Sequence, residues 1–454
     1  MSAVEAAAGK AQAMVRDSVK TVIAASMVGT AIEFYDFYAY GTAAANYFPK
    51  VFFGDTTNPT VALLASLLTF AIAFIARPLG SLVFGHFGDR MGRKTTLVVS
   101  LLTMGVATFL IGCLPTYSQW GIVAVAALCL CRFVQGIGLG GEWSGAALVA
   151  TENAPEDKRA LYGSFPELGA PIGFFLSNGT YFLLETFNDD DAMLAWGWRV
   201  PFLLAGPLGL IVLYIRAKLA DSPVYQSMND ALESKGAASA DGQIAAKSGM
   251  FAPLAELFHN HLKALIISFG ACVLNAVGFY TVLTYLPTYL SDTVGMDAPQ
   301  SGTITTICLV LYVALVFGMG HISDMFGRKK VLIGACVAFI VLTVPAFMVL
   351  NTAQFWPVLI VELAMCATLT ANDGTLSSYL TETFSTSVRF TGFAFSFNLA
   401  NAIFGGTAPF IATWLIYATG SSIAPAWYMV AVVAVALVAM ILSHENTDKD
   451  LSHI

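Results

Sequence analysis

Charged residues are scarce in this chain, and their scarcity excludes most kinds of soluble protein. Only 11% of the 454 residues are Asp, Glu, Lys or Arg, whereas 57% are hydrophobic. Soluble globular domains average about 25% charged residues. Apolar runs longer than the ~18 residues of a transmembrane helix candidate recur from end to end. The composition therefore predicts a helical protein that crosses a membrane many times. It argues against a large soluble α/β enzyme, whose helices need polar faces.

The sequence also lacks the cysteine patterns of metal and redox sites. The seven cysteines lie in apolar stretches, without a CxxC pair or a Cys/His cluster of metal-ligand spacing. We expect them to be small apolar packing residues, and we expect no metal site. No cleavable signal peptide is expected, and residues 1–20 are expected to form a cytoplasmic N-terminal tail.

Twelve apolar segments predict an all-α integral membrane fold with 12 transmembrane helices. The expected spans are 21–47, 60–84, 95–114, 122–151, 160–184, 200–219, 264–289, 301–319, 331–350, 355–380, 391–415 and 424–442. A polar segment, residues 220–263, separates a six-helix half (residues 21–219) from a second one (residues 264–442). Its centre is rich in Gly, Ala and Ser and is predicted to be a flexible cytoplasmic linker. Residues 443–454 would form a cytoplasmic tail.

Basic residues predict the orientation of these spans. If the N-terminus is cytoplasmic, all but four of the 22 Lys and Arg fall in inner loops, the linker or the tails. The four exceptions are Lys50 and Arg199 on the outer side and Arg77 and Arg132 within spans. Because positive residues accumulate on the cytoplasmic side, both termini are expected to be cytoplasmic.

The two halves repeat each other. Residues 85–97 read GHFGDRMGRKTTL and residues 320–332 read GHISDMFGRKKVL, with seven of the 13 positions identical. A second echo follows spans four and ten, with the same seven-residue separation in each copy: Glu152…Arg159 and Glu382…Arg389. Duplicated six-helix halves are a transporter architecture, with a substrate site near mid-membrane between the halves.

The repeated loop motif resembles the inner-loop signature of the major facilitator superfamily. Its glycines permit a tight turn, and its acid can accept bonds from nearby basic groups. The resemblance implies that the matched residues govern switching between conformations rather than substrate contact. They are Gly85, Asp89, Arg90, Gly92, Arg93 and Lys94, with Asp324, Gly327 and Arg328 in the second copy. The second copy carries Met325 in place of the arginine.

Stretches along nearly the whole chain resemble the metabolite:H⁺ symporter family of this superfamily. They include EFYDFYAYG, ARPLG, RFVQGIGLGGEWSGAALVATENAP, GSFPELGAPIG, GWRVPF and DSPVY. That family includes transporters for shikimate, α-ketoglutarate, citrate and proline/betaine. The resemblance implies a monomeric symporter of the inner (plasma) membrane that uses the proton gradient and no cofactor. The chain departs from the family pattern at Glu167, Asp221, Asn372 and Asp373.

One glycine pattern resembles a nucleotide-binding motif but does not have the context that such a site requires. Gly136, Gly138 and Gly141 match G-x-G-x-x-G but lie within a predicted span, not between a strand and a helix, so no nucleotide site is expected. Gly136 and Gly140 instead have the GxxxG spacing that lets membrane helices approach closely.

Ionisable groups within spans carry most of the functional information, because charge inside a bilayer is costly. No Lys or His lies mid-span, so any proton carrier in the membrane is expected to be a carboxylate. The candidates are Glu33, Asp36, Arg77, Arg132, Glu142, Glu167, Glu362 and Asp373.

Asp36 and Arg132 are expected at matching depth, roughly 16 Å and about 15 Å from the outer ends of spans one and four. Glu33 shares a helix face with Asp36. Arg132, whose planar fork suits a carboxylate, is predicted to bind an anionic substrate, and Asp36 or Glu33 to carry the proton. The alternative is a permanent structural ion pair.

Other residues receive weaker predictions. Further substrate-binding candidates are Tyr40, Glu167, Asn275, Tyr280 and Tyr285. Gating or structural roles are predicted for Arg77, Glu142, Glu152, Arg159, Glu382 and Arg389. Tyrosines at such positions are more often packing residues, and Glu362 is a candidate for lining the cavity.

Together these features favour a proton-coupled secondary transporter. It would import a small organic acid, such as shikimate or a di- or tricarboxylate, by alternating access. A proline/betaine-type zwitterion is the alternative substrate, because an Arg–carboxylate pair could hold both of its ends. A non-transporting sensor on a transporter scaffold would need an added signalling domain. An enzyme is not expected, and the expected partners are a small solute, protons and the lipid bilayer, without nucleic acid.

Overall fold

The computed structural model describes residues 3–54, 58–217, 252–447 and 451, so the centre of the predicted linker lies outside the described residues. Within these ranges the chain is helical and contains no β-strand. It forms two compact units. Unit 1 comprises residues 1–155 and 168–250, and unit 2 comprises residues 156–167 and 251–454.

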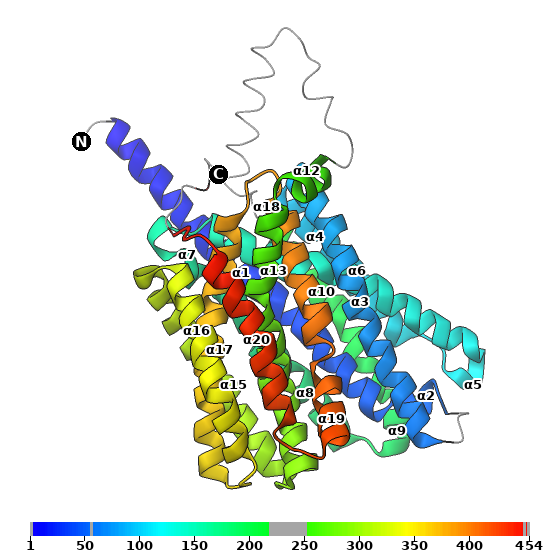
Figure 1. Cartoon of the computed structure of the whole chain (residues 1–454). Coiled ribbons are helices and arrows are strands. Elements are labelled where there is room, and N and C mark those ends of the chain that lie inside the picture. Colours follow the sequence, from blue (N-terminus) through cyan, green and yellow to red (C-terminus); the bar gives the residue numbers. More distant parts are fainter. Residues whose placement is uncertain (1–2, 55–57, 218–251, 448–450, 452–454) are drawn as a thin grey trace. The chain divides into compact units, whose positions relative to one another are not determined.

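The helices of unit 1 are α1 (Ala3–Asn46), α2 (Phe48–Val51), α3 (Pro59–Met91), α4 (Arg93–Cys113), α5 (Tyr117–Trp120), α6 (Ile122–Glu152), α8 (Gly169–Phe187), α9 (Asp190–Ala195), η3 (Gly197–Arg199) and α10 (Val200–Ala217). Helices α3 and α4 both pack against α6, and α1 packs along α8 (Figure 1). Helix α1 begins at Ala3, well before the expected start of the first span at Thr21.

The helices of unit 2 are η1 (Glu156–Lys158), α7 (Arg159–Gly163), η2 (Phe165–Leu168), α12 (Ala252–Asn260), α13 (Leu262–Gly278), η4 (Phe279–Tyr285), α14 (Leu286–Thr288), η5 (Tyr289–Val294), α15 (Ala298–Phe326), α16 (Arg328–Leu350), α17 (Phe355–Thr383), α18 (Arg389–Ala400), η6 (Asn401–Gly405), α19 (Ala408–Thr419) and α20 (Ala424–Leu442). Helix η2 ends on Leu168, the first residue that returns to unit 1. Helices α15 and α16 both pack against α17, and α13 packs against α20 (Figure 1).

Residues 156–167 pack with unit 2, although they connect two helices of unit 1. Their short helix α7 contacts α15 and α17. The expected start of the fifth span at residue 160 was therefore wrong, because the continuous helix α8 begins only at Gly169. Pro166, which has no backbone N–H to donate, lies in the interruption.

The two copies of the loop motif share an unusual backbone conformation. Gly92 precedes α4 with φ of 104°, and Gly327 precedes α16 with φ of 96°. Side chains rarely tolerate positive φ, so glycine is needed at both positions. The sequence repeat is thus also a repeat of backbone geometry.

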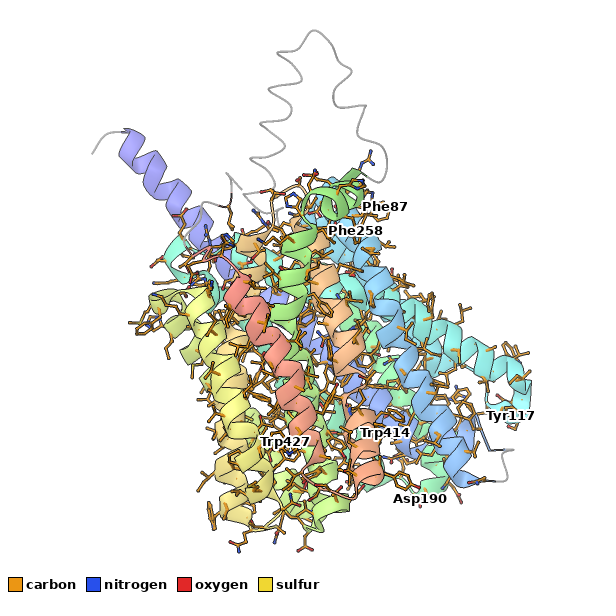
Figure 2. All side chains as sticks on the ribbon, in the orientation of Figure 1. Phe87, Tyr117, Asp190, Phe258, Trp414 and Trp427 are labelled. Carbon is orange, nitrogen blue, oxygen red and sulfur yellow. The ribbon has the colours of Figure 1, made fainter. Side chains whose placement is uncertain are left out.

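Ten helices of the described residues are long and apolar enough to cross a membrane. They correspond to the expected spans other than the first and the fifth, so the total of 12 remains a prediction. Apolar side chains cover their outer surfaces. On α3, for example, Leu64, Leu68 and Ile75 are 61%, 67% and 68% exposed. In Figure 2, Trp414 on α19 and Trp427 on α20 likewise project outward. Such surfaces suit contact with lipid.

Glycines of α6 bring it into close contact with α3. A Cβ on Gly136 would lie 2.6 Å from the carbonyl oxygen of Ala73, and one on Gly140 would lie 2.4 Å from that of Arg77. Backbone atoms cannot move aside as a flexible side chain can. The GxxxG spacing therefore serves helix packing.

We predict that Gly140→Ala destabilises unit 1, because the added methyl group overlaps the backbone of α3. A loss of about 1–3 kcal/mol is expected from such overpacking. The thermal unfolding temperature of the purified, detergent-solubilised variant should be several degrees lower than that of the unmodified protein. Gly105→Ala on α4 is the matched control, since a Cβ there meets nothing within 4 Å. Equal unfolding temperatures for the two variants would contradict the close contact.

Candidate transport site

Glu33 pairs with Arg77 in the interior of unit 1. Nη2 of Arg77 donates a hydrogen bond to Oε1 of Glu33, joining α3 to α1. Both residues are buried. The guanidinium carbon of Arg77 also lies 5.8 Å from the centre of the Phe74 ring. Removing either partner would leave a buried charge uncompensated. The structure therefore gives Glu33 a partner other than Arg132.

Asp36 and Arg132 meet in the interior of unit 1, as their matching depth predicts. Nη1 of Arg132 lies 3.7 Å from Oδ2 of Asp36, which is too far for a direct hydrogen bond. Gln135 bridges the two residues. Its Nε2 donates to Oδ2 of Asp36 at 2.5 Å, and its Oε1 accepts from Nη1 of Arg132. All three side chains are at most 1% exposed.

Gln135 is a site residue that the sequence analysis missed. It lies three residues after Arg132, hence on the same face of α6. Its Nε2 also donates to Oγ1 of Thr108 on α4, at 2.8 Å. A polar residue one turn after a buried arginine is the signal that could have identified it.

Aromatic rings enclose the guanidinium group of Arg132. Its central carbon lies 3.9 Å from the centre of the Tyr40 ring and 5.1 Å from that of Phe70. Such cation–π contacts stabilise a cation that has little access to water. The hydroxyl of Tyr40 lies 2.7 Å from Oγ1 of Thr69. Tyr40, predicted to contact substrate, thus acts on Arg132 through its ring.

Unit 2 contains a second buried polar cluster, centred on Asp373 of α17. Nδ2 of Asn275 on α13 donates to Oδ1 of Asp373 at 2.8 Å. The hydroxyl of Tyr312 on α15 donates to Oδ2 at 2.5 Å. The substrate candidate Asn275 therefore has a carboxylate partner, and Tyr312 is a residue that sequence reasoning missed.

The two candidate tyrosines of span seven lie in the π-helical segment η4. Tyr280 is buried, and its ring packs against the Gly405 backbone, where a Cβ would lie 2.7 Å away. The hydroxyl of Tyr285 accepts a hydrogen bond from Oγ1 of Thr413 at 3.0 Å. Both contacts join η4 to the region of η6 and α19, which favours a packing role. Glu167 is buried in η2, in the part of the chain that packs with unit 2.

The first loop motif forms an ion-pair network around Arg93. Its Nη1 lies 2.7 Å from Oδ1 of Asp89 and 2.8 Å from the carbonyl oxygen of Gly88, and its Nη2 lies 3.5 Å from Oε1 of Glu152. Gly85 is buried, whereas Arg90 is exposed and Lys94 half-buried. Glu142, further along α6, accepts a hydrogen bond from Oγ of Ser100 at 2.9 Å.

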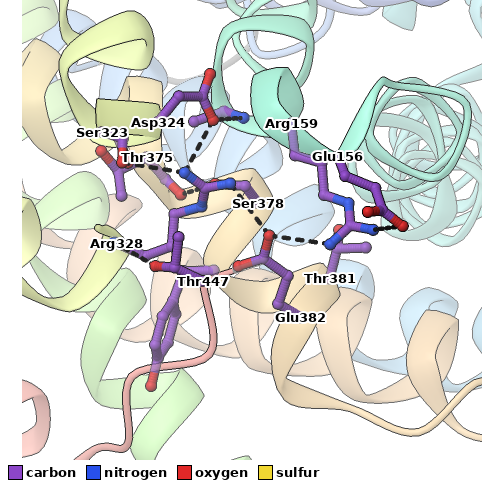
Figure 3. Close-up of polar contacts among 12 residues, drawn as sticks. Glu156, Arg159, Ser323, Asp324, Arg328, Thr375, Ser378, Thr381, Glu382 and Thr447 are labelled. Atoms are coloured by element: carbon purple, nitrogen blue, oxygen red, sulfur yellow. Dashed lines mark hydrogen bonds and ion pairs between the residues drawn. The ribbon is translucent and has the colours of Figure 1, made fainter. Parts of the chain in front are cut away.

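The second loop motif repeats this network around Arg328 (Figure 3). Its Nη1 lies 2.8 Å from Oδ1 of Asp324 and donates to the carbonyl oxygen of Ser323 at 3.0 Å. Its Nη2 lies 3.2 Å from Oε1 of Glu382. An acid, an arginine four residues later and a glutamate at the end of a long helix thus recur in both units.

Residues 156–167 add to the network of unit 2. Nη1 of Arg159 lies 3.6 Å from Oε1 of Glu382, so this carboxylate interacts with two arginines (Figure 3). Asp324 accepts hydrogen bonds from the backbone N–H groups of Ala160 and Leu161, both at 2.9 Å.

The glutamates of the second sequence echo make equivalent contacts, since Glu152 interacts with Arg93 and Glu382 with Arg328. Of the two arginines of this echo, Arg159 interacts with Glu382. Arg389 donates to the carbonyl oxygens of Phe384 and Leu451, at 3.1 Å and 3.0 Å.

The chain matches a known protein family and several individual transport proteins. The family described as "Sugar (and other) transporter" matches residues 21–454. The chain is 42% identical to the inner membrane metabolite transport protein YhjE of Escherichia coli, over 96% of both sequences. It is 34% identical to the glycine betaine/proline/ectoine/pipecolic acid transporter OusA of Dickeya dadantii, over 95% of this chain and 85% of that protein.

The fold resembles that of a solved transporter structure. The proton:xylose symporter XylE of the major facilitator superfamily, bound to 6-bromo-6-deoxy-D-glucose, superimposes with a TM-score of 0.77. The alignment covers 96% of this chain and 98% of the other, at 18% sequence identity. At this identity, the match is evidence for the fold alone.

We predict that losing one charge of the Glu33–Arg77 pair destabilises the protein more than losing both charges. Glu33→Gln or Arg77→Gln alone leaves one buried charge and should cost about 3–5 kcal/mol. The double variant removes both charges, and its thermal stability in detergent should recover most of that loss. Additive losses in the double variant would show that the two residues do not interact.

Proposed function

Because the chain belongs to the sugar (and other) transporter family of the major facilitator superfamily, we propose that it is a proton-coupled symporter of a small carboxylate-bearing solute. The observation that carries this proposal is the buried contact of Asp36, Gln135 and Arg132 in unit 1. It combines a group that can bind a proton with a group that can bind a carboxylate, and Gln135 links the two by hydrogen bonds.

The charge balance of unit 1 suggests a coupling mechanism. Glu33 and Arg77 compensate each other, as do Asp36 and Arg132. Protonation of Asp36 would leave Arg132 without an anionic partner. The substrate carboxylate would then take the place of the Asp36 carboxylate beside Arg132. Both events together preserve neutrality, which a low-dielectric interior favours. Gln135 can accommodate either state, because its amide group both donates and accepts.

The membrane topology is part of the proposal. The chain is a multi-pass protein of the inner membrane, the location named for its E. coli relative. We propose 12 spans, both termini in the cytoplasm and a monomer. The two loop networks would then lie on the cytoplasmic side and stabilise one state of an alternating-access cycle.

A zwitterion such as proline or betaine is the second candidate substrate. The names of several relatives support it, since they include the transporter from D. dadantii and proline/betaine transporters. In such a solute the carboxylate would bind Arg132 while the cationic end approaches a carboxylate. An organic acid such as shikimate or a di- or tricarboxylate would need only the arginine.

We predict that Asp36→Asn strongly lowers proton-driven accumulation but retains exchange of preloaded substrate in proteoliposomes. The amide imitates the neutral form of Asp36, so substrate can bind, but no proton is taken up or released at this residue. Asp297→Asn, at an exposed position, is the control. Uphill accumulation by Asp36→Asn at the rate of the unmodified protein would exclude Asp36 as the proton carrier.

We predict that Arg132→Ala weakens substrate binding by about 30-fold or more, the effect of removing one partner of a buried charged hydrogen bond. Thermal-shift titrations with shikimate, citrate, dicarboxylates, aromatic acids, proline and betaine would identify a ligand of the unmodified protein. The same ligand is then titrated into Arg132→Ala and into Lys50→Ala, which removes an exposed cation. Unchanged affinity in Arg132→Ala would reject Arg132 as the carboxylate anchor.

A further inference from the structure

Helix α17 of unit 2 buries two carboxylates that lack a cationic partner. Glu362 and Asp373 are both 0% exposed, and neither forms an ion pair with any described residue. Arg159 and Arg328 reach α17 at its far end, where they contact Glu382. That position is about 30 Å along the helix from Glu362.

This arrangement differs from that of unit 1, where each buried carboxylate of the α1 pair faces an arginine. An isolated ionised carboxylate in a medium of low dielectric constant is strongly unfavourable and is neutralised instead. Two such groups on one helix cannot both stay ionised at low cost. At least one of Glu362 and Asp373 must therefore bind a proton.

Hydrogen bonding distinguishes the two carboxylates. Asp373 accepts one hydrogen bond on each oxygen, from Asn275 and from Tyr312. Donors of this kind stabilise the charged form of a carboxylate. Neither oxygen of Glu362 has a hydrogen-bond partner among the described residues. The proton is therefore expected on Glu362.

The neighbours of Glu362 are neutral. Thr305 and Cys308 of α15 lie beside its carboxyl group, without forming hydrogen bonds of ordinary geometry. Further titratable groups near it are Cys366, which lies next to Cys308, and Tyr312. Around Tyr312 the further charged groups are acids, Asp373 and Glu167. None of these groups supplies the positive charge that an ionised Glu362 would need.

The sequence repeat relates Glu362 to the site of unit 1. An offset of 230 residues connects Glu152 to Glu382, and the same offset connects Arg132 to Glu362. The loop motif repeats at an offset of 235 residues, which relates Phe70 of α3 to Thr305 of α15. Phe70 contacts Arg132, and Thr305 lies beside Glu362, so this contact also recurs. Equivalent positions in the two units thus both hold an ionisable group.

We propose that Glu362 is a second proton-binding residue, which carries a proton while buried and releases it when water reaches the contact of α15 and α17. This inference rests on the proposed function as a proton-coupled transporter. In the step itself, only the O–H bond of the Glu362 carboxyl group breaks. The proton passes to water and leaves a carboxylate, which is reprotonated later in the cycle.

Infrared spectroscopy of the full-length protein in lipid vesicles tests the proposal without a known substrate. A buried, protonated carboxyl group gives a C=O stretching band separate from that of a carboxylate. We expect such a band in the unmodified protein, its loss at alkaline pH, and its absence from Glu362→Gln. Asp373→Asn, the matched control on the same face of α17, should retain it. Glu362→Asp, which preserves the carboxyl group, should shift the band and guards against misfolding of the amide variant.

Two infrared results would overturn the proposal. One is a band that persists in Glu362→Gln and Glu362→Asp without change. The other is a Glu362 band that stays constant from mildly acidic to alkaline pH, because such a group would be a permanently neutral structural acid. Neither result depends on transport. An unmodified protein that moves no solute with a proton gradient would refute the proposed function instead.

Transport stoichiometry gives a second readout. Glycine betaine, named for one relative, serves as the probe solute in proteoliposomes. Each coupled proton multiplies the attainable concentration ratio of the solute by the proton concentration ratio across the membrane. With a tenfold proton ratio, loss of one of two coupled protons should therefore lower the steady-state solute ratio about tenfold. Glu362→Gln should show this loss while still accumulating solute. Accumulation equal to that of the unmodified protein, or driven by a sodium gradient alone, would contradict a proton at Glu362.

Discussion

The need to neutralise buried charge underlies the rest of this structure. A charge that leaves water for a low-dielectric interior must be paired, hydrogen-bonded or protonated. Unit 1 meets this need with two arginines for the two carboxylates of α1. Unit 2 meets it differently, with neutral donors around Asp373. These two solutions determine which groups can exchange a partner and which are held permanently.

Neutral side chains in the charged site of unit 1 allow Arg132 to exchange one anionic partner for another. Asp36 and Arg132 do not bond directly, because Gln135 lies between them and bonds to both. A direct bidentate ion pair would bind the arginine strongly and exclude a substrate carboxylate. An amide bridge leaves part of the guanidinium group available, while the Tyr40 ring supports its charge. The proposed exchange between proton and substrate depends on this looser arrangement.

The loop networks show how a duplicated structure can acquire different contacts. Both units hold an acid, an arginine and a glutamate in the same arrangement, next to a glycine with positive φ. In unit 2, Arg159 and the backbone N–H groups of residues 156–167 also bind the second network. The duplicated motif therefore keeps its own contacts in both units, while unit 2 adds those of this segment.

The sequence by itself determined the helical membrane architecture, the repeat and the identity of the buried charges. The resemblance to the major facilitator superfamily, carried by GDRMGRK, is confirmed by the family match. These properties are local, since bilayer thickness sets span length and charge is costly wherever it occurs in a span. Only the tertiary structure decided that Arg77 pairs with Glu33, that Gln135 bridges Asp36 to Arg132 and that residues 156–167 leave unit 1. Such pairings depend on the rotation and packing of helices far apart in sequence, which hydrophobic pattern does not encode.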